Sequence, residues 1–283
     1  MKREAALKNI LVPVEDHDLM DVVLTTACQI GRAFGSRIEG IALGPDTGDL
    51  IAADFAIAGS IFDEKTRRSL VEGARKIFDA AMVRENVPAA QESADRVAHG
   101  WAGGEMSTDS GIGAYARLFD LTIVGRPGSG RGDARRATLE SVLFDSGRPI
   151  MIVPPKGSPS VGKTAVISWN RSTETARTIA FAMPLLKKAE RVVVLTVTGA
   201  LTPGPPASLL MRALQRHGLA VDCVEVDSGS KNAGRVILDK AASLGADLIV
   251  KGGYTQSRLR QMIFGGATSE ILANTDIPVI MAH

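Results

Sequence analysis

Short apolar runs alternate along the chain with longer segments of helical periodicity. In the first half the runs lie at residues 9–14, 37–43, 92–98, 121–124 and 150–153, and the segments with apolar residues at helical spacing lie at 19–34, 62–84, 105–118 and 136–145. Runs that are apolar on both faces are typical of strands covered by helices on both sides. The pattern predicts a mainly parallel sheet whose strands are joined by crossover helices.

The second half repeats this order of elements. Its expected strands lie at 164–169, 191–197, 220–226, 248–251 and 278–281, and its expected helices at 174–188, 207–217, 233–244 and 267–273. Aligning Glu15 with Asn170 and Gly125 with Gly252 leaves extra residues in the first copy, which we place at 44–61. The repeat predicts an α/β fold of two tandem, doubly wound parallel-sheet domains.

We expect the first domain to span 1–155, a linker 156–163 and the second domain 164–283. The last strand of each copy is short and apolar, and pairing the two would protect two sheet edges at once. The chain is therefore expected to form an intrachain pseudo-dimer, with a homodimer as a further possibility.

Composition excludes several classes of protein. Hydrophobic residues make up 45% and charged residues 23% of the chain, which favours a globular protein over a disordered or membrane protein. The net charge is +2 without a basic stripe, so dedicated nucleic-acid binding is not expected. Cys28 and Cys223 lie far apart, which argues against a disulfide framework or a structural zinc site. The N-terminal apolar run, broken by Pro13, is too short for a signal peptide or membrane span, so we expect a cytoplasmic protein.

Residues 157–164, GSPSVGKT, match the letters of the phosphate-binding P-loop. A P-loop leaves a strand and opens a helix, so that backbone amides converge on the phosphate. Here Lys163 and Thr164 run into AVISW, the expected first strand of the second copy. We therefore interpret the match as part of the linker, and Lys163→Ala should leave nucleotide binding intact.

A more specific pattern follows the fourth strand of the second copy. Residues 252–268, GGYTQSRLRQMIFGGAT, place a glycine after the strand, a small residue three positions later, then nine residues and a Gly-Gly pair opening a helix. This pattern resembles the G-x2-G-x9-G-[S/T] signature of ATP-binding universal stress proteins. The flanking ADLIVKGG and ANTDIPVIMAH, the opening KNILVPVE and the run VVVLTV are also similar to that family.

The resemblance implies an ATP site, with Mg²⁺ as a possible companion, in the second domain. Gly252, Thr255, Gly265 and Gly266 would line the phosphates; Asn170 would take the place of an Asp that meets the nucleoside, and the backbone of Val197 would meet adenine. Thr255 and Gly266 depart from the family pattern, because the first adds a Cβ and the second removes a hydroxyl. Thr268 is a candidate to supply that hydroxyl.

The first copy departs further. Thr138 and Leu139 stand where the second glycine pair would be, and Glu15 would direct a carboxylate toward an anionic ligand. Arginines near this loop offer binding of phosphate by charge as one alternative, and a solvated surface as the other; they are Arg126, Arg131, Arg135 and Arg136.

No residue is assigned a catalytic or metal-binding role. The four histidines, of which only His17 lies near the expected site, form no metal-ligand spacing, and no G-x-S-x-G elbow is present. The principal hypothesis is a stress-response protein that binds ATP or a related adenine nucleotide in the second domain, with weak hydrolysis at most. The alternatives are a nucleotide-free interaction module with a decayed site, and an enzyme of the adenine-nucleotide α-hydrolase type.

Overall fold

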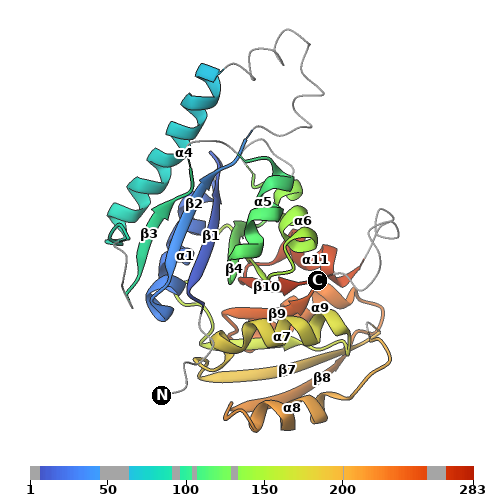
Figure 1. Ribbon diagram of the computed structural model, residues 1–283. Coiled ribbons are helices and arrows are strands. Elements are labelled where there is room, and N and C mark those ends of the chain that lie inside the picture. Colours follow the sequence, from blue (N-terminus) through green and yellow to red (C-terminus); the bar gives the residue numbers. More distant parts are fainter. Residues whose placement is uncertain are drawn as a thin grey trace. The chain divides into compact units, whose positions relative to one another are not determined.

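The computed structural model describes residues 7–44, 64–90, 96–103, 107–128, 133–199, 201–253 and 266–283 (Figure 1). The chain divides into two compact units, Leu7–Arg148 and Pro149–His283, which we call the first unit and the second unit. Of the insertion expected at 44–61, only Gly44 lies among the described residues.

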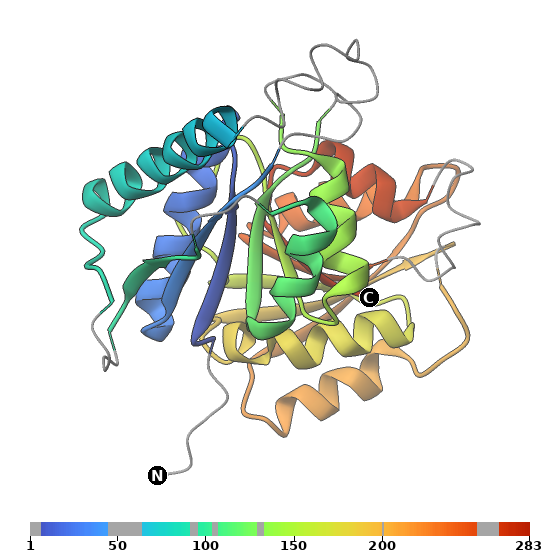
Figure 2. The same ribbon diagram turned by 45° about the horizontal axis from the view of Figure 1, so that its top comes forward.

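The first unit is a four-stranded parallel sheet in the order β3-β2-β1-β4. Helices α1 and α4 pack on each other and on β1, while α5 and α6 form a second contacting pair. Figure 2 shows these two pairs on opposite faces of the sheet. Its elements are β1 (Asn9–Val14), α1 (Met20–Phe34), β2 (Arg37–Ala42), α4 (Glu64–Arg84), β3 (Ala98–Trp101), α5 (Asp109–Tyr115), a 3-10 turn (Ala116–Leu118), β4 (Leu121–Gly125) and α6 (Arg136–Asp145).

The second unit carries six strands in the order β5-β10-β9-β6-β7-β8. The helices α7 and α8 lie on one face and α9 and α11 on the other, as Figure 1 shows, because the chain winds first toward β8 and then back toward β10. Its elements are β5 (Ile150–Val153), β6 (Thr164–Ser168), α7 (Thr173–Leu186), β7 (Arg191–Thr198), α8 (Ala207–Gln215), β8 (Val221–Asp227), α9 (Ala233–Ser243), β9 (Leu248–Gly252), α11 (Ala267–Asn274) and β10 (Val279–Ala282).

The strand β5 belongs to the first repeat in sequence and to the second unit in space. It pairs antiparallel with β10, with Val279 opposite Ile152 and Met281 opposite Ile150. This confirms the expected pairing of the two terminal strands. The boundary between repeats and the boundary between packed units therefore fall at different residues.

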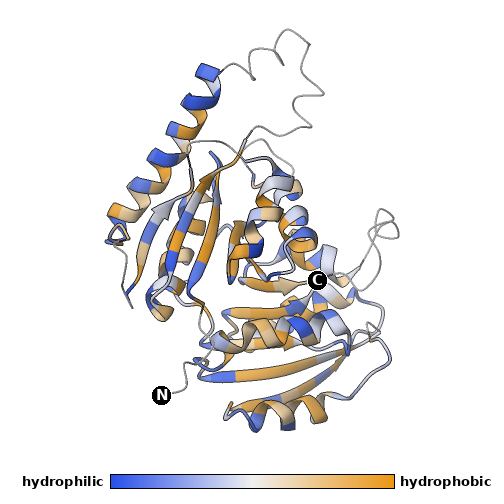
Figure 3. Cartoon of the chain, viewed as in Figure 1, coloured by the Kyte–Doolittle hydropathy of each residue, from blue (hydrophilic) through white to orange (hydrophobic). Residues whose placement is uncertain are grey.

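The core is built from small aliphatic side chains on the strands. Every residue of β4, β5, β9 and β10 is buried, and Figure 3 shows strands such as β7 as mainly hydrophobic. Such strands need helices on both faces, which the doubly wound arrangement provides. The α/β fold expected from the apolar runs is therefore confirmed.

Two elements of the first unit differ from the sequence prediction. Of the third strand expected at 92–98, residues 92–95 lie outside the described residues, whereas β3 is Ala98–Trp101 and lies at the edge of the sheet, where partial exposure removes the apolar signal. Helix α5 starts at Asp109 rather than at residue 105, because the side chain of Thr108 accepts a hydrogen bond from Gly111 N and caps the helix there.

Candidate functional site

The carboxyl ends of β6 and β9 form the natural ligand position of the second unit. The chain passes from β6 toward β8 on one side and from β9 toward β10 on the other, so strand order reverses between β6 and β9. Ligands of open parallel sheets bind at this switch point. Five predicted site residues are described at or near this edge, and Thr255 and Gly265 lie outside the described residues; the five are Asn170, Val197, Gly252, Gly266 and Thr268.

Asn170 follows β6 and turns its side-chain oxygen toward the start of α7. Its Oδ1 accepts hydrogen bonds from Thr175 Oγ1 at 2.6 Å and from Ser172 N at 3.2 Å. Ser172 is itself the N-cap of α7 and accepts from Thr175 N at 3.2 Å. The carboxamide oxygen thus organises the entry to α7, and the Nδ2 hydrogens are the part of Asn170 suited to an external acceptor.

Gly252 ends β9 directly against the start of α7. A Cβ at this position would lie 2.5 Å from Thr175 N and 2.8 Å from Glu174 C, closer than side chains approach backbone. Thr175 therefore contacts both predicted residues: its hydroxyl donates to Asn170, and its backbone lies against Gly252. The glycine is required by packing, whatever else it does.

Lys251, the residue before Gly252, is a member of this cluster that the sequence analysis did not single out. Its side chain is buried, and Nζ donates to Gly252 O at 2.9 Å and to Thr268 Oγ1 at 2.8 Å. Thr268 is the second residue of α11, after the N-cap Gly266, which provides no side-chain cap, and Ala267. The hydroxyl of Thr268 is thus engaged by the lysine. A charged residue inside an otherwise apolar strand was the signal available in the sequence.

Val197 is buried near the end of β7. Its peptide groups face the side of β6, but β6 ends before it reaches Val197. Trp169 N, just after β6, donates to Leu195 O at 2.8 Å. Peptide groups of alternate strand residues point to the same neighbour, so those of Val197 point the same way as those of Leu195. Beside them, Asn170 O accepts from Thr202 N at 3.0 Å.

The loop after β6 also holds Arg171 in a left-handed conformation, with φ of 71°. Such a conformation is unfavourable for a residue with a Cβ and tends to occur at functional sites. Its neighbour Trp169 is buried and donates from Nε1 to Pro205 O at 3.0 Å. Trp169 therefore packs in the core and fixes the loop that carries Pro205.

The P-loop letters at 157–164 do not form a phosphate site. Thr164 begins β6, as expected, rather than a helix. The amides of Gly162, Lys163 and Thr164 all donate to the carboxylate of Asp247, at 3.1, 3.1 and 2.8 Å. The backbone donors of this segment are therefore satisfied by a side chain of the same unit.

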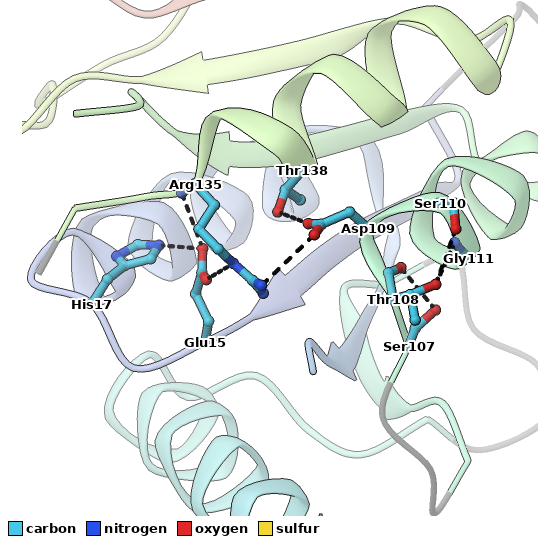
Figure 4. Close-up of polar contacts among 9 residues, drawn as sticks. All are labelled: Glu15, His17, Ser107, Thr108, Asp109, Ser110, Gly111, Arg135 and Thr138. Carbon is cyan, nitrogen blue, oxygen red and sulfur yellow. Dashed lines mark hydrogen bonds and ion pairs between the residues drawn. The ribbon is translucent and has the colours of Figure 1, made fainter. Parts of the chain in front are cut away.

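In the first unit, the position that matches Asn170 is part of an ion-pair network (Figure 4). Glu15 Oε2 lies 2.7 Å from Arg135 Nε, and both side chains are mostly buried, with 17% and 14% exposed. Arg135 is the N-cap residue of α6, and its backbone N also approaches Glu15 Oε1 at 3.5 Å. The carboxylate of Glu15 thus lies at the N-terminus of α6 in the first unit. The corresponding helix of the second unit, α11, has no side-chain cap at its N-terminus.

Asp109 and His17 complete this network. Asp109 accepts from Thr138 Oγ1 at 2.6 Å and lies 3.7 Å from Arg135 Nη1, as Figure 4 shows. His17 Nδ1 accepts from Leu19 N at 3.1 Å, and Nε2 lies 3.6 Å from Glu15 Oε1. Burial lowers the pKa of His17 below its usual value, and the nearby Glu15 acts in the opposite direction.

The other arginines of this region do not join one cluster. Arg136 pairs with Glu140 at 2.9 Å on the exposed face of α6, and Arg131 lies outside the described residues. Of the four arginines, Arg135 thus lies in a mostly buried ion pair and Arg136 in an exposed one.

None of the helices among the described residues has the length and apolar character of a membrane span. The same residues contain no cluster of three or more His, Cys, Asp or Glu side chains arranged to hold a metal ion.

Comparison with known proteins gives consistent similarities. Residues 185–283 match the model of the universal stress protein family. A 75-residue segment is 32% identical to the stress response protein NhaX of Bacillus subtilis (strain 168); it represents 26% of this chain and 42% of that protein, so the match spans less than half of the relative.

Solved structures show the same fold over nearly the whole chain. The universal stress protein from Archaeoglobus fulgidus DSM 4304 matches with a TM-score of 0.73 and 15% identity, over 97% of this chain and 95% of that chain. A putative universal stress protein from Pseudomonas aeruginosa UCBPP-PA14 matches with a TM-score of 0.53 and 15% identity, over 98% and 93%.

Proposed function

We propose that the second unit binds an adenine nucleotide at the carboxyl ends of β6 and β9, on the premise that its residues 185–283 match the universal stress protein family. The ligand proposed for the first test is ATP with Mg²⁺. We further propose a cytoplasmic location and, at most, weak hydrolysis.

The observation that carries this proposal is the convergence of two helix N-termini on the end of β9. Gly252 lies against the first turn of α7, and Lys251 is hydrogen-bonded to the first turn of α11. Helix N-termini offer free amides and a positive dipole end to anions such as phosphate. The peptide groups of Val197 supply a donor and an acceptor for the edge of a base.

The test is the nucleotide content of protein purified without added ATP, followed by calorimetric titration with ATP and Mg²⁺. Adenine nucleotide near one per chain, or a titration with that stoichiometry, supports the proposal. Lys163→Ala should retain binding, because Lys163 is exposed and its amide is held by Asp247.

A matched pair at Gly266 localises the site. Gly266→Asp places a carboxylate at the N-cap of α11, where it stabilises the helix but repels phosphate. Gly266→Asn gives a neutral side chain of the same shape, and a Cβ here meets no atom of the described residues within 4 Å. Loss of ATP binding in the Asp variant alone supports a phosphate at α11; equal binding in both variants contradicts it.

The second candidate is a nucleotide-free interaction module. It is favoured by the internal use of two oxygens that the nucleotide hypothesis would assign to the ligand, Asn170 Oδ1 and Thr268 Oγ1. Absence of bound nucleotide and of titration heat would select this candidate. In that case Thr255→Gly combined with Gly266→Ser should create binding, because it restores the family pattern.

A further inference from the structure

Lys251 is a buried cation whose two hydrogen-bond acceptors carry no formal charge. Its side chain lies at the end of β9 and the residue is 7% exposed. The acceptors among the described residues are the carbonyl of Gly252 and the hydroxyl of Thr268. A buried ammonium is costly unless a charge of opposite sign compensates it, and its third N–H still needs an acceptor.

The surroundings of Lys251 favour an anion rather than a cation. Thr268 places Nζ at the first turn of α11, where the helix dipole is positive, and Gly252 places the next residue against the first turn of α7. Each helix end repels a lysine and attracts an anion. Burial lowers the pKa of Lys251 to about 8, and the carboxylate of Glu174 acts against this shift.

Among the described residues, α7 packs against β9 and carries Glu174 and the exposed Arg177. The neighbouring strands β6 and β10 contain no charged residue. On α11, Glu270 accepts a hydrogen bond from Asn274 at 3.0 Å; on α9, Arg235 and Asp239 pair with each other at 3.1 Å. After β10, His283 Nδ1 lies 3.5 Å from Gly253 O.

We propose that Lys251 recognises the charge of the ligand: its ammonium pairs with a phosphate group bound against the N-terminus of α11, so the site selects phosphorylated nucleotides over nucleosides. This inference rests on the proposed function for the adenine part of the ligand, but not for the phosphate. Lys251, a strand residue, would thus bind the phosphate in place of the hydroxyl that the family pattern has at position 266. The first unit has Val124 at the matching position and a Glu15–Arg135 pair beside it.

The first experiment compares ATP, AMP and adenosine by calorimetry on the full chain. Lys251→Met keeps the length of the side chain and removes the charge, and Lys163→Met removes an exposed lysine as a matched control. We expect Lys251→Met to bind ATP and AMP about tenfold or more weakly, because a charge-assisted hydrogen bond is lost. Adenosine should bind equally well to all three proteins.

The second experiment follows the Lys251 side chain itself by NMR in wild-type protein with isotope-labelled lysine, which avoids any effect of substitution on folding. Inorganic phosphate and AMP should each raise the pKa of Lys251, because a bound anion favours the protonated amine. In wild-type protein the affinity for AMP should then fall as the pH rises through about 8, whereas that of Lys251→Met should stay level. His283→Asn controls for the nearby imidazole.

The outcomes separate the two proposals. If no nucleotide binds but phosphate raises the pKa of Lys251, the nucleotide proposal fails and the assignment of Lys251 stands. A second outcome is that nucleotides bind, the pKa of Lys251 does not move, and Lys251→Met prefers ATP and AMP over adenosine as strongly as wild-type protein does. The assignment of Lys251 is then overturned and the nucleotide proposal stands. If neither phosphate nor nucleotide moves the pKa, the assignment is overturned as well.

Discussion

Replacing Gly252 by alanine distinguishes a packing role from a ligand role for the first glycine of the signature. The added Cβ would lie 2.5 Å from Thr175 N and 2.8 Å from Glu174 C, both backbone atoms of the first turn of α7. Ordinary contacts of carbon begin near 3.5 Å, so helix and strand must separate by several tenths of an ångström or more. Overpacking of this kind costs about 1–3 kcal/mol.

Gly266→Ala is the matched control, because it makes the same chemical change in the second glycine pair. A Cβ at Gly266 meets no atom of the described residues within 4 Å, and the φ of −127° at Gly266 suits any residue. Urea unfolding monitored by circular dichroism should therefore show a lower free energy of unfolding for Gly252→Ala and a change within about 0.5 kcal/mol for Gly266→Ala. Equal stability of both variants, or a larger loss for Gly266→Ala, would refute the steric argument.

Three further predictions concern groups away from the second-unit cluster. Glu15→Gln should lower the free energy of unfolding by about 1–3 kcal/mol, because it removes the carboxylate at 2.7 Å from the mostly buried Arg135 and leaves only Asp109, at 3.7 Å, as its counter-charge. Glu140→Gln, in an exposed pair, should change it by about 0.5 kcal/mol or less, and both values are measured by urea unfolding. Burial lowers the pKa of His17 below 6.5, so the unfolded chain binds a proton more readily than the folded protein. The free energy of unfolding of wild-type protein should therefore decrease from about pH 7 to about pH 5 more steeply than that of His17→Asn. Parallel curves for the two proteins would contradict the lowered pKa of His17. In a thiol assay with an aromatic disulfide reagent, exposed Cys223 should react in the native protein, and Cys28, whose pKa burial raises to about 12, only after unfolding; two fast thiols would contradict the structure.

The periodicity of apolar residues was sufficient to predict most of the fold. Strands such as β1 and β5 are buried along almost their whole length, and their boundaries agree with the apolar runs at 9–14 and 150–153. The prediction was wrong for β3 because an edge strand is only partly covered and its sequence, AHGW, carries no continuous apolar run.

The contacts within the candidate site could be predicted from the sequence only in part. Repeat alignment identified Asn170 and Gly252, but it could not show that Thr175 links them, because this depends on how closely α7 approaches β9. Lys251 does not stand out in the sequence, because it is the last residue of the short apolar run at 248–251. The pairing of Glu15 with Arg135 joins residues far apart in the sequence, and no local pattern encodes it.

The position of β5 has a consequence for how the chain can be divided. A fragment that starts at Thr164 follows the sequence repeat but removes the partner of β10, and it leaves the backbone donors and acceptors of Val279–Ala282 open along one edge. Open edges recruit further strands, so such a fragment is expected to self-associate through β10. A fragment that starts at Pro149 keeps β10 paired with β5 and is expected to self-associate less through β10 at the same concentration. The point at which the gene is cut, rather than any change of side chain, would then decide the assembly state of the same domain.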